Sequence, residues 1–234
     1  MLHTCRAFVL KTFRHSDKSV VLKAYTAHVG LRTYLVRTGK RGGAALQALN
    51  RVEIVADEHG AREMHQVRDI RVQAPFRRIG PDPLRTTVAL FVQEILYRVL
   101  REEAPDPALF AFIDEALEHL DTAEDVRYFP LLFLLRLSGH LGFLPEAPGP
   151  GEDRFDLREG HFIAGGIEHG HTLGPVPSSA LAALLPLDLG DVPARPLPPS
   201  LRRELLDHLL LYYRLHLEGL GELRSPSVLH QVLG

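Results

Sequence analysis

The chain has 234 residues, of which 45% are hydrophobic and 24% charged, with one cysteine and a formal net charge of -2. These values exclude a disordered chain, a collagen-like chain and a disulfide-stabilised scaffold. The small total averages two unlike parts: residues 1–80 hold 15 Lys and Arg against 6 Asp and Glu, a net charge of +9, whereas residues 81–234 carry -11. A basic module of this kind points to an anionic partner, either nucleic acid or an acidic protein, unless it docks on its own acidic neighbour.

The cellular compartment is predicted from the cysteine count and the apolar runs. Cys5 is the one cysteine of the sequence, so no intramolecular disulfide can form, and its apolar surroundings favour a buried structural thiol. The first residues contain no apolar stretch typical of a signal peptide. The longest apolar run, residues 129–137, is interrupted by Pro130 and Arg136 and is too short to span a membrane. We expect a cytoplasmic protein without a membrane partner.

The first part of the chain predicts a small β-barrel. Runs rich in apolar, aromatic and β-branched residues predict five strands, at residues 7–13, 20–26, 31–38, 52–56 and 63–72. Glycine-containing turns separate the second strand from the third and the fourth from the fifth, and residues 44–49 are long enough for a short helix. Five strands with a helix after the third favour an OB-type barrel, and an SH3-like barrel fits the strand count almost as well.

After Pro81-Asp82-Pro83 the apolar residues recur at helical spacing. Helices are predicted at residues 84–99, 107–120, 180–185, 201–217 and 227–232, and one more from a cap at or near Asp125 through Phe133 to Leu141. A short hairpin is predicted near 155–163. The predicted fold class is therefore α+β. A five-stranded OB-type barrel at residues 1–80 is followed by a mainly α-helical domain at residues 81–234.

Catalytic signatures are absent from the sequence, because it contains no GxSxG, no P-loop and no HExxH motif. His161, His169 and His171 lie close together beside Glu168 and could supply metal ligands. No second pair of ligands follows at the spacing of a structural zinc site, so polar loop residues are the better interpretation. An enzyme is not predicted, and a histidine-site hydrolase would require bound metal.

The basic residues of the barrel form the candidate DNA-binding site: Arg14, Lys18, Lys23, Arg32, Tyr34, Arg37, Lys40 and Arg41. Cations in a barrel groove neutralise phosphates and aromatic rings stack on bases, so binding should be salt-sensitive and sequence-tolerant. Lys40 and Arg41, between glycines, are the expected principal phosphate contacts. Tyr25 and Tyr34 suit either stacking or the core, and Phe13 is expected in the core. The alternative is a protein-interaction adaptor whose basic barrel binds acidic partners and not DNA.

Short motifs follow one another along nearly the whole chain, at residues 7–14, 16–18, 20–22, 25–26, 28–30, 34–41 (YLVRTGKR), 94–97, 137–142 (LSGHLG), 155–162, 213–217 and 223–225. Their order resembles that of the RecO family of bacterial recombination mediators. The resemblance implies an N-terminal OB domain and a C-terminal helical domain. It also implies binding to single- and double-stranded DNA, strand annealing, action with RecR and with the C-terminal tail of single-stranded DNA-binding protein, and indirect action on RecA, with no cofactor.

One departure from the family concerns zinc. Many members carry a four-cysteine zinc module around the hairpin, whereas residues 144–173 of this chain contain no cysteine. The resemblance therefore implies a zinc-free variant. The acidic partner tail ends in an apolar residue and a carboxylate, so its site needs an apolar pocket beside an arginine. The candidates for this site are Arg127, Arg136, Arg202 and Arg203.

Overall fold

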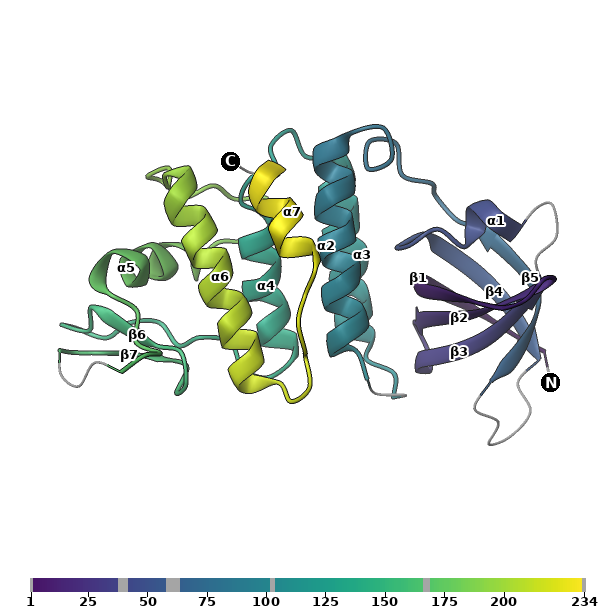
Figure 1. Ribbon diagram of the computed structural model, residues 1–234, viewed down its shortest axis with the longest axis horizontal. Helices are drawn as coiled ribbons and strands as arrows, with labels where there is room; N and C mark the ends of the chain where they lie inside the picture. Colours follow the sequence, from purple (N-terminus) through teal and green to yellow (C-terminus); the bar gives the residue numbers. More distant parts are fainter. Residues whose placement is uncertain (1, 38–41, 58–63, 102–103, 166–168, 233–234) are drawn as a thin grey trace. The chain divides into compact units, whose positions relative to one another are not determined.

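The computed structural model describes residues 2–37, 42–57, 64–101, 104–165 and 169–232 (Figure 1). The chain forms two compact units, Met1–Glu115 and Ala116–Gly234. The expected boundary after residue 80 marks the change from strands to helices. The first compact unit continues beyond it and includes α2 (Pro83–Val99) and the first half of α3 (Pro107–Thr122).

The first unit is built on a closed five-stranded barrel (Figure 1). Its elements are β1 (Leu2–Ser16), β2 (Ser19–Thr26), β3 (Gly30–Arg37), α1 (Gly42–Ala45), β4 (Arg51–Asp57) and β5 (His65–Val72). The strands neighbour one another in the order β1-β2-β3-β5-β4, and β4 pairs with β1 to close the barrel. The strand order, with a short helix between β3 and β4, confirms the OB-type barrel.

The barrel core follows the two-residue alternation of its strands. In β4, for example, Val52, Ile54 and Ala56 are buried while the residues between them are half-buried. The core consists of Cys5, Ala7, Val9, Leu22, Ala24, Tyr34, Val36, Ala45, Val52, Ile54, Ala56 and Val67. The thiol of Cys5 is buried and free of disulfides, as the sequence predicted.

A register shift in β1 reverses the faces of the residues that follow it. Val9 pairs with the core residue Ala24, but Lys11 pairs with Lys23, so β1 has one residue more than β2 over this stretch. Such a β-bulge turns later side chains to the opposite face, because the side-chain period of a strand is two. Phe13 is consequently 39% exposed on the outer face, and its predicted place in the core is wrong.

The helices of the first unit cover part of the outer barrel surface. Phe110 of α3 packs against Phe8 and Tyr25, with ring centroids 4.7 and 6.2 Å apart. Gln93 of α2 donates a hydrogen bond to the carbonyl oxygen of Leu10 at 2.6 Å. Tyr25 is therefore a packing residue, which resolves the two interpretations left open by the sequence.

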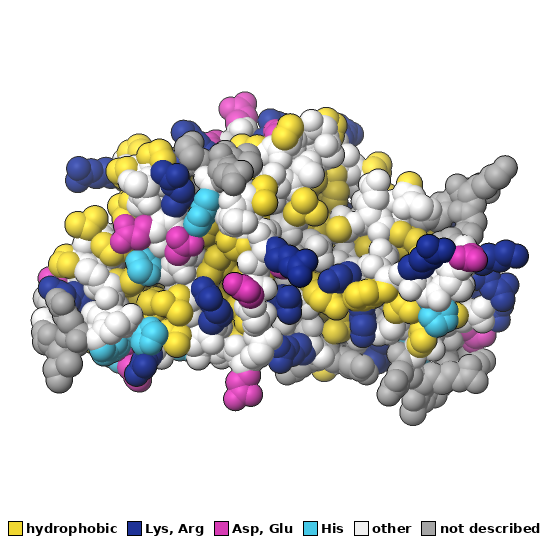
Figure 2. All heavy atoms as spheres, viewed as in Figure 1, with side chains coloured by type: hydrophobic (Ala, Val, Ile, Leu, Met, Phe, Trp, Pro, Cys, Tyr) yellow, Lys and Arg dark blue, Asp and Glu magenta, His cyan; other side chains and the backbone are white. Residues whose placement is uncertain are grey.

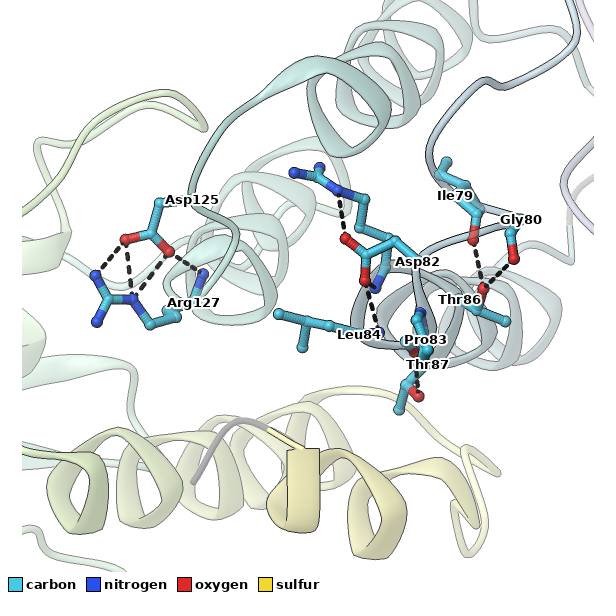
Figure 3. Close-up of polar contacts among 10 residues, drawn as sticks. Ile79, Gly80, Asp82, Pro83, Leu84, Thr86, Thr87, Asp125 and Arg127 are labelled. Carbon is cyan, nitrogen blue, oxygen red and sulfur yellow. Dashed lines mark hydrogen bonds and ion pairs between the residues drawn. The ribbon is translucent and has the colours of Figure 1, made fainter.

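Helix α2 begins at an acidic cap. The Asp82 carboxylate accepts hydrogen bonds from the backbone N–H groups of Leu84 and Arg85 at 2.9 and 3.3 Å, and Pro83 occupies the first helical position (Figure 3). These bonds satisfy two of the donors that a helix N-terminus leaves unpaired. The guanidinium of Arg85, itself buried, also binds the same carboxylate at 3.1 Å.

The second unit is helical around a buried central helix. Its elements after α3 are α4 (Phe129–His140), β6 (Arg154–Asp156), β7 (His161–Ile163), α5 (Pro175–Leu184), α6 (Pro199–His216) and α7 (Ser225–Val232). The predicted hairpin is thus present as β6 and β7. Helix α5 begins earlier than predicted, because Pro175 lies in its first turn, where a proline ring fits, and does not interrupt it. Helix α4 begins at Phe129, after the predicted cap at or near Asp125, and Pro130 lies in its first turn.

Two tyrosines of α6 fix the neighbouring segments. The hydroxyl of Tyr213 donates to the carbonyl of Leu134 in α4 at 2.6 Å, and that of Tyr212 donates to the carbonyl of Phe143 at 2.7 Å. Burial raises the pKa of Tyr213 well above its usual value and that of Tyr212 to about 12, so both remain hydrogen-bond donors at neutral pH. Among the described residues, no helix combines the length and apolar character needed to cross a membrane.

Candidate functional site

The outer face of β1, β2 and β3 combines cations with apolar side chains. Opposite one another across the three strands lie Lys11, Lys23 and Thr33. The neighbouring row on the same face consists of Phe13, Val21 and Leu35. These six residues are called the barrel face below. Lys and Arg side chains are frequent over the barrel strands in Figure 2.

Lys11 and Lys23 face each other directly on this surface. Within the described part of the chain, neither lysine forms an ion pair with a carboxylate. Like charges at opposite positions of antiparallel strands destabilise the sheet. A bound anion such as a DNA phosphate would relieve this repulsion, which makes the pair a candidate anion-binding site.

The exposed cations among the predicted residues surround the barrel face. Lys18 lies in the turn between β1 and β2, and Arg37 ends β3. Both are exposed, and neither has an ion pair within the described residues. Arg14 lies 2.5 Å from Asp17, but their side chains are 79% and 87% exposed. An ion pair so exposed is weak and would yield to a phosphate.

Two predicted residues belong to the inward side of β3. Arg32 pairs with the core residue Ala24 and is half-buried, so it is less accessible than Arg37. Tyr34 is fully buried, and its hydroxyl lies 3.6 Å from the sulfur of Cys5. A ring enclosed in the barrel cannot stack on a base. The assignment of Tyr34 to the DNA-binding site is therefore wrong, because alternation along β3 points it inward.

Lys40 and Arg41 lie outside the described residues. Their predicted role as the principal phosphate contacts therefore rests on the sequence alone.

Lys11 and Tyr97 were not predicted as site residues, and Phe13 was expected in the core. The ammonium of Lys11 lies 4.6 Å from the ring centroid of Tyr97 in α2 and 5.3 Å from that of Phe13. The two rings are 6.4 Å apart and tilted by 53°. The sequence contains one indication of the position of Tyr97. This residue lies outside the apolar stripe from which α2 was predicted, so its ring had to lie on a different face of the helix.

Comparison with known proteins adds the family to this geometry. Models described as Recombination protein O N terminal and Recombination protein O C terminal match residues 1–76 and 80–226. The chain belongs to the RecO family. The DNA repair protein RecO of Christiangramia forsetii is 29% identical over 240 residues and covers 100% of both chains. That of Porphyromonas gingivalis is 30% identical over 240 residues and covers 98% of both. Family membership gives the chain a role in DNA repair and recombination.

The second unit of this RecO-family chain contains a hollow with an apolar floor and a basic rim. It is shallow, with a cavity volume of only about 10 Å³, and is lined by Pro130, Leu131 and Leu206 together with Arg127, Arg202, Arg203 and His230. Three of the four arginines predicted for an acidic tail are thus brought together. This basic rim contrasts with the acidic character of the second unit, because residues 116–234 hold 9 Lys and Arg against 16 Asp and Glu.

The rim arginines differ in how they are engaged. Arg127 forms a bidentate ion pair with Asp125, in which its Nη2 lies 2.6 Å from the carboxylate (Figure 3). Hydrogen bonding from Arg127 lowers the pKa of Asp125, so the pair is charged at neutral pH. Arg202 lies over the ring of Tyr128 and donates to a backbone carbonyl. Arg203 is exposed and forms no ion pair with any described carboxylate, which makes it the rim residue best able to bind an incoming carboxylate.

Arg136 is separate from this group. It is not among the residues that line the hollow, and its guanidinium donates to the carbonyl of Leu185 and lies 3.9 Å from Asp188. It therefore ties α4 to the end of α5.

The histidines near the hairpin make protein contacts. His169 Nε2 donates to the Asp156 carboxylate at 2.9 Å, while His169 Nδ1 accepts from the backbone N–H of His171 at 3.2 Å. Both ring nitrogens of His169 are therefore used in hydrogen bonds, which fixes the orientation of the ring. Asp156 also accepts from the N–H groups of Arg158 and Glu159. The contact ties the loop before α5 to the hairpin.

These residues do not fit a four-ligand zinc site. His169 and Asp156 bind each other, and Glu168 lies outside the described residues. His161 and His171 remain, but within the described ranges no three His, Cys, Asp or Glu side chains form a group that could hold a metal ion. The hairpin is held by hydrogen bonds and by the packing of Phe155 on Phe162 and Tyr212.

The Asp156 contact predicts a pH-dependent contribution to stability. Burial raises the pKa of this carboxyl, but the hydrogen bonds from Arg158, His169 and Glu159 outweigh burial, so the pKa lies below its usual value. The stabilisation is therefore present above about pH 4 and lost as the pH falls through the lowered pKa. Asp156→Asn should reduce the free energy of unfolding by about 1–3 kcal/mol at pH 7, measured by urea denaturation.

The difference between Asp156→Asn and wild type should shrink as the pH falls through the lowered pKa of Asp156, because the wild-type carboxyl then becomes protonated. Asp153→Asn is the matched control, because Asp153 is exposed and three residues away. An equal loss in both variants, or a difference that does not change with pH, would contradict the assignment.

Proposed function

We propose that this RecO-family chain is a non-enzymatic recombination mediator of the bacterial cytosol and nucleoid. In this proposal the barrel binds single- and double-stranded DNA and anneals complementary strands. Acting with RecR and single-stranded DNA-binding protein, the chain helps to load RecA onto coated single strands. The observation that carries the proposal is the pair Lys11–Lys23 on the barrel face, which has no carboxylate partner among the described residues.

The barrel face suits a strand that must be held and still remain able to pair. Lysine and arginine contact phosphates, and these contacts leave the hydrogen-bonding edges of the bases unoccupied. Two strands held in this way can test each other for complementarity while their mutual repulsion is reduced by the protein's cations. Annealing then requires charge and access but no chemical step.

The hollow of the second unit suits the C-terminal tail of single-stranded DNA-binding protein. An apolar terminal side chain would lie on Leu131 and Leu206, and the terminal carboxylate would bind Arg203. The surrounding unit carries an excess of acidic residues, so an acidic tail is repelled elsewhere and bound at this rim.

The competing function is an adaptor whose basic barrel binds acidic proteins and not DNA. DNA binding releases condensed counterions, so the logarithm of its affinity falls linearly with the logarithm of salt. A steep slope with single-stranded DNA supports the mediator, and absence of binding supports the adaptor.

Charge reversal on the barrel should weaken DNA binding. The double variant Lys23→Glu/Arg37→Glu removes two phosphate contacts and should lower affinity for a single strand at least about 10-fold at low salt, while the salt slope falls by about 1.4. The variant Lys40→Glu/Arg41→Glu tests the sequence-based site in the same way. Fluorescence anisotropy with labelled DNA measures affinity, and annealing of coated strands measures activity.

Arg195→Glu is the matched control for these reversals, because Arg195 is exposed, lies in the second unit and forms no ion pair within the described chain. An equal loss of DNA affinity in Arg195→Glu would contradict the assignment of the DNA-binding site to the barrel. Unchanged affinity of both double variants at moderate salt would contradict it as well.

Charge reversal of the rim residue Arg203 should weaken binding of the acidic tail. Arg203→Glu should weaken, by about 10- to 100-fold, the binding of an acidic peptide that ends in an apolar residue and a free carboxylate. The same peptide with a C-terminal amide should bind wild type weakly. Arg195→Glu again serves as control. Equal affinity for the acid and amide peptides would contradict a carboxylate site.

We propose that the hairpin folds without zinc, in line with the missing cysteines and the engaged His169. Purified protein should contain no stoichiometric zinc by elemental analysis, and chelator should leave its thermal unfolding unchanged. One zinc per chain, or a lower melting temperature with chelator, would overturn this proposal.

A further inference from the structure

Phe13 and Tyr97 form an aromatic pair in the first unit whose arrangement is not explained by core packing alone. Phe13 lies on the barrel face and is 39% exposed, although a neighbouring helix is available to cover it. Tyr97 of α2 is half-buried beside it, with ring centroids 6.4 Å apart. The tilt of 53° between the rings excludes parallel stacking of one ring on the other.

A cation adjoins both rings. The Lys11 ammonium lies 5.3 Å from the centroid of Phe13 and 4.6 Å from that of Tyr97, and Lys23 is directly across the sheet. An anion bound by these lysines therefore lies next to the aromatic rings. The chemical group that presents an anion and a flat π-surface so close together, repeated along a chain, is a nucleotide of a single strand.

The main alternative is a structural contact in which Lys11 holds α2 to the barrel through cation–π attraction. That contact explains the position of Lys11 over Tyr97. It does not explain why two lysines oppose each other with no carboxylate partner among the described residues, or why a phenylalanine on the same face is left exposed. The hydrogen bond from Gln93 to Leu10 already attaches α2 to β1 at this point.

We propose that Phe13 and Tyr97 form a stacking platform in which an unpaired base lies flat on the Phe13 ring, while Lys11 and Lys23 hold the adjoining phosphate. The platform makes the barrel face selective for single strands over duplex DNA. In a duplex both faces of each base are covered by its neighbours, so only the phosphate contacts remain. This inference rests on the proposed DNA-binding function and adds to it the strand selectivity and the residues that produce it.

The platform is tested with two substitutions in the full chain that keep a bulky side chain. Phe13→Leu retains an apolar group and removes the ring, whereas Phe13→Tyr retains the ring. Phe13→Leu should bind a single-stranded oligothymidine at least about 5-fold more weakly than wild type. Its affinity for duplex DNA and its salt slope should remain unchanged, because stacking releases no counterions. Phe13→Tyr should match wild type in both assays.

A direct readout of stacking uses a single strand that contains 2-aminopurine, whose fluorescence is quenched when the base stacks. Binding of wild type and Phe13→Tyr should quench it, and binding of Phe13→Leu at saturation should quench it less. Equal quenching by all three proteins, or an equal loss of single-strand and duplex affinity in Phe13→Leu, would overturn the platform.

The variant Lys11→Glu/Lys23→Glu separates this inference from the function on which it rests. If that variant loses DNA binding and Phe13→Leu keeps it, the barrel binds DNA without the platform, and the inference alone fails. If neither variant affects DNA binding, the proposed function of the barrel face fails as well.

Discussion

The β-bulge in β1 is the constraint on which the barrel face depends. Before it, alternate residues of β1 fill the core as far as Val9, and an uninterrupted alternation would have continued inward through Lys11 and Phe13. A buried, unpaired lysine at that place would destabilise the barrel by several kcal/mol. One extra residue, Leu10, turns both side chains outward and sets Lys11 opposite Lys23. The feature that protects the core thus also creates the charged aromatic surface.

The charge distribution reinforces this division of roles. The first compact unit has an excess of cations, with 18 Lys and Arg against 13 Asp and Glu, and the second has the reverse. A long-range field of this kind steers anionic chains towards the barrel and away from the helices. In the acidic second unit, an acidic ligand therefore needs a local cluster of basic residues to bind to. The basic rim around Leu131 and Leu206 is such a cluster. The charge asymmetry organises the two proposed sites.

The fold could be predicted further from the sequence than the site. Strand alternation and helical spacing are local signals, and they located the barrel, the hairpin and the helices. The bounds were wrong where β1 extends beyond residues 7–13 and where Pro175 begins α5. The faces of strands depend on register, which a single sequence does not reveal. Tyr34 was therefore assigned to DNA although it lies in the core, and Phe13 to the core although it is exposed. The position of Tyr97 beside Phe13 depends on the packing of α2 on β1. This contact joins residues over 80 positions apart, so the sequence could not reveal it.

The balance of phosphate and base contacts determines how tightly a mediator can hold its strand. Three phosphate contacts to a single strand give a salt slope of about 2, so raising salt from 50 to 200 mM weakens the electrostatic term roughly 20-fold. A stacked base adds about 1–3 kcal/mol that salt does not screen. At physiological salt the Phe13–Tyr97 pair would then supply a large share of the affinity for single strands. Because stacking uses the face of a base and not its edge, the bound strand would still be able to pair with its complement.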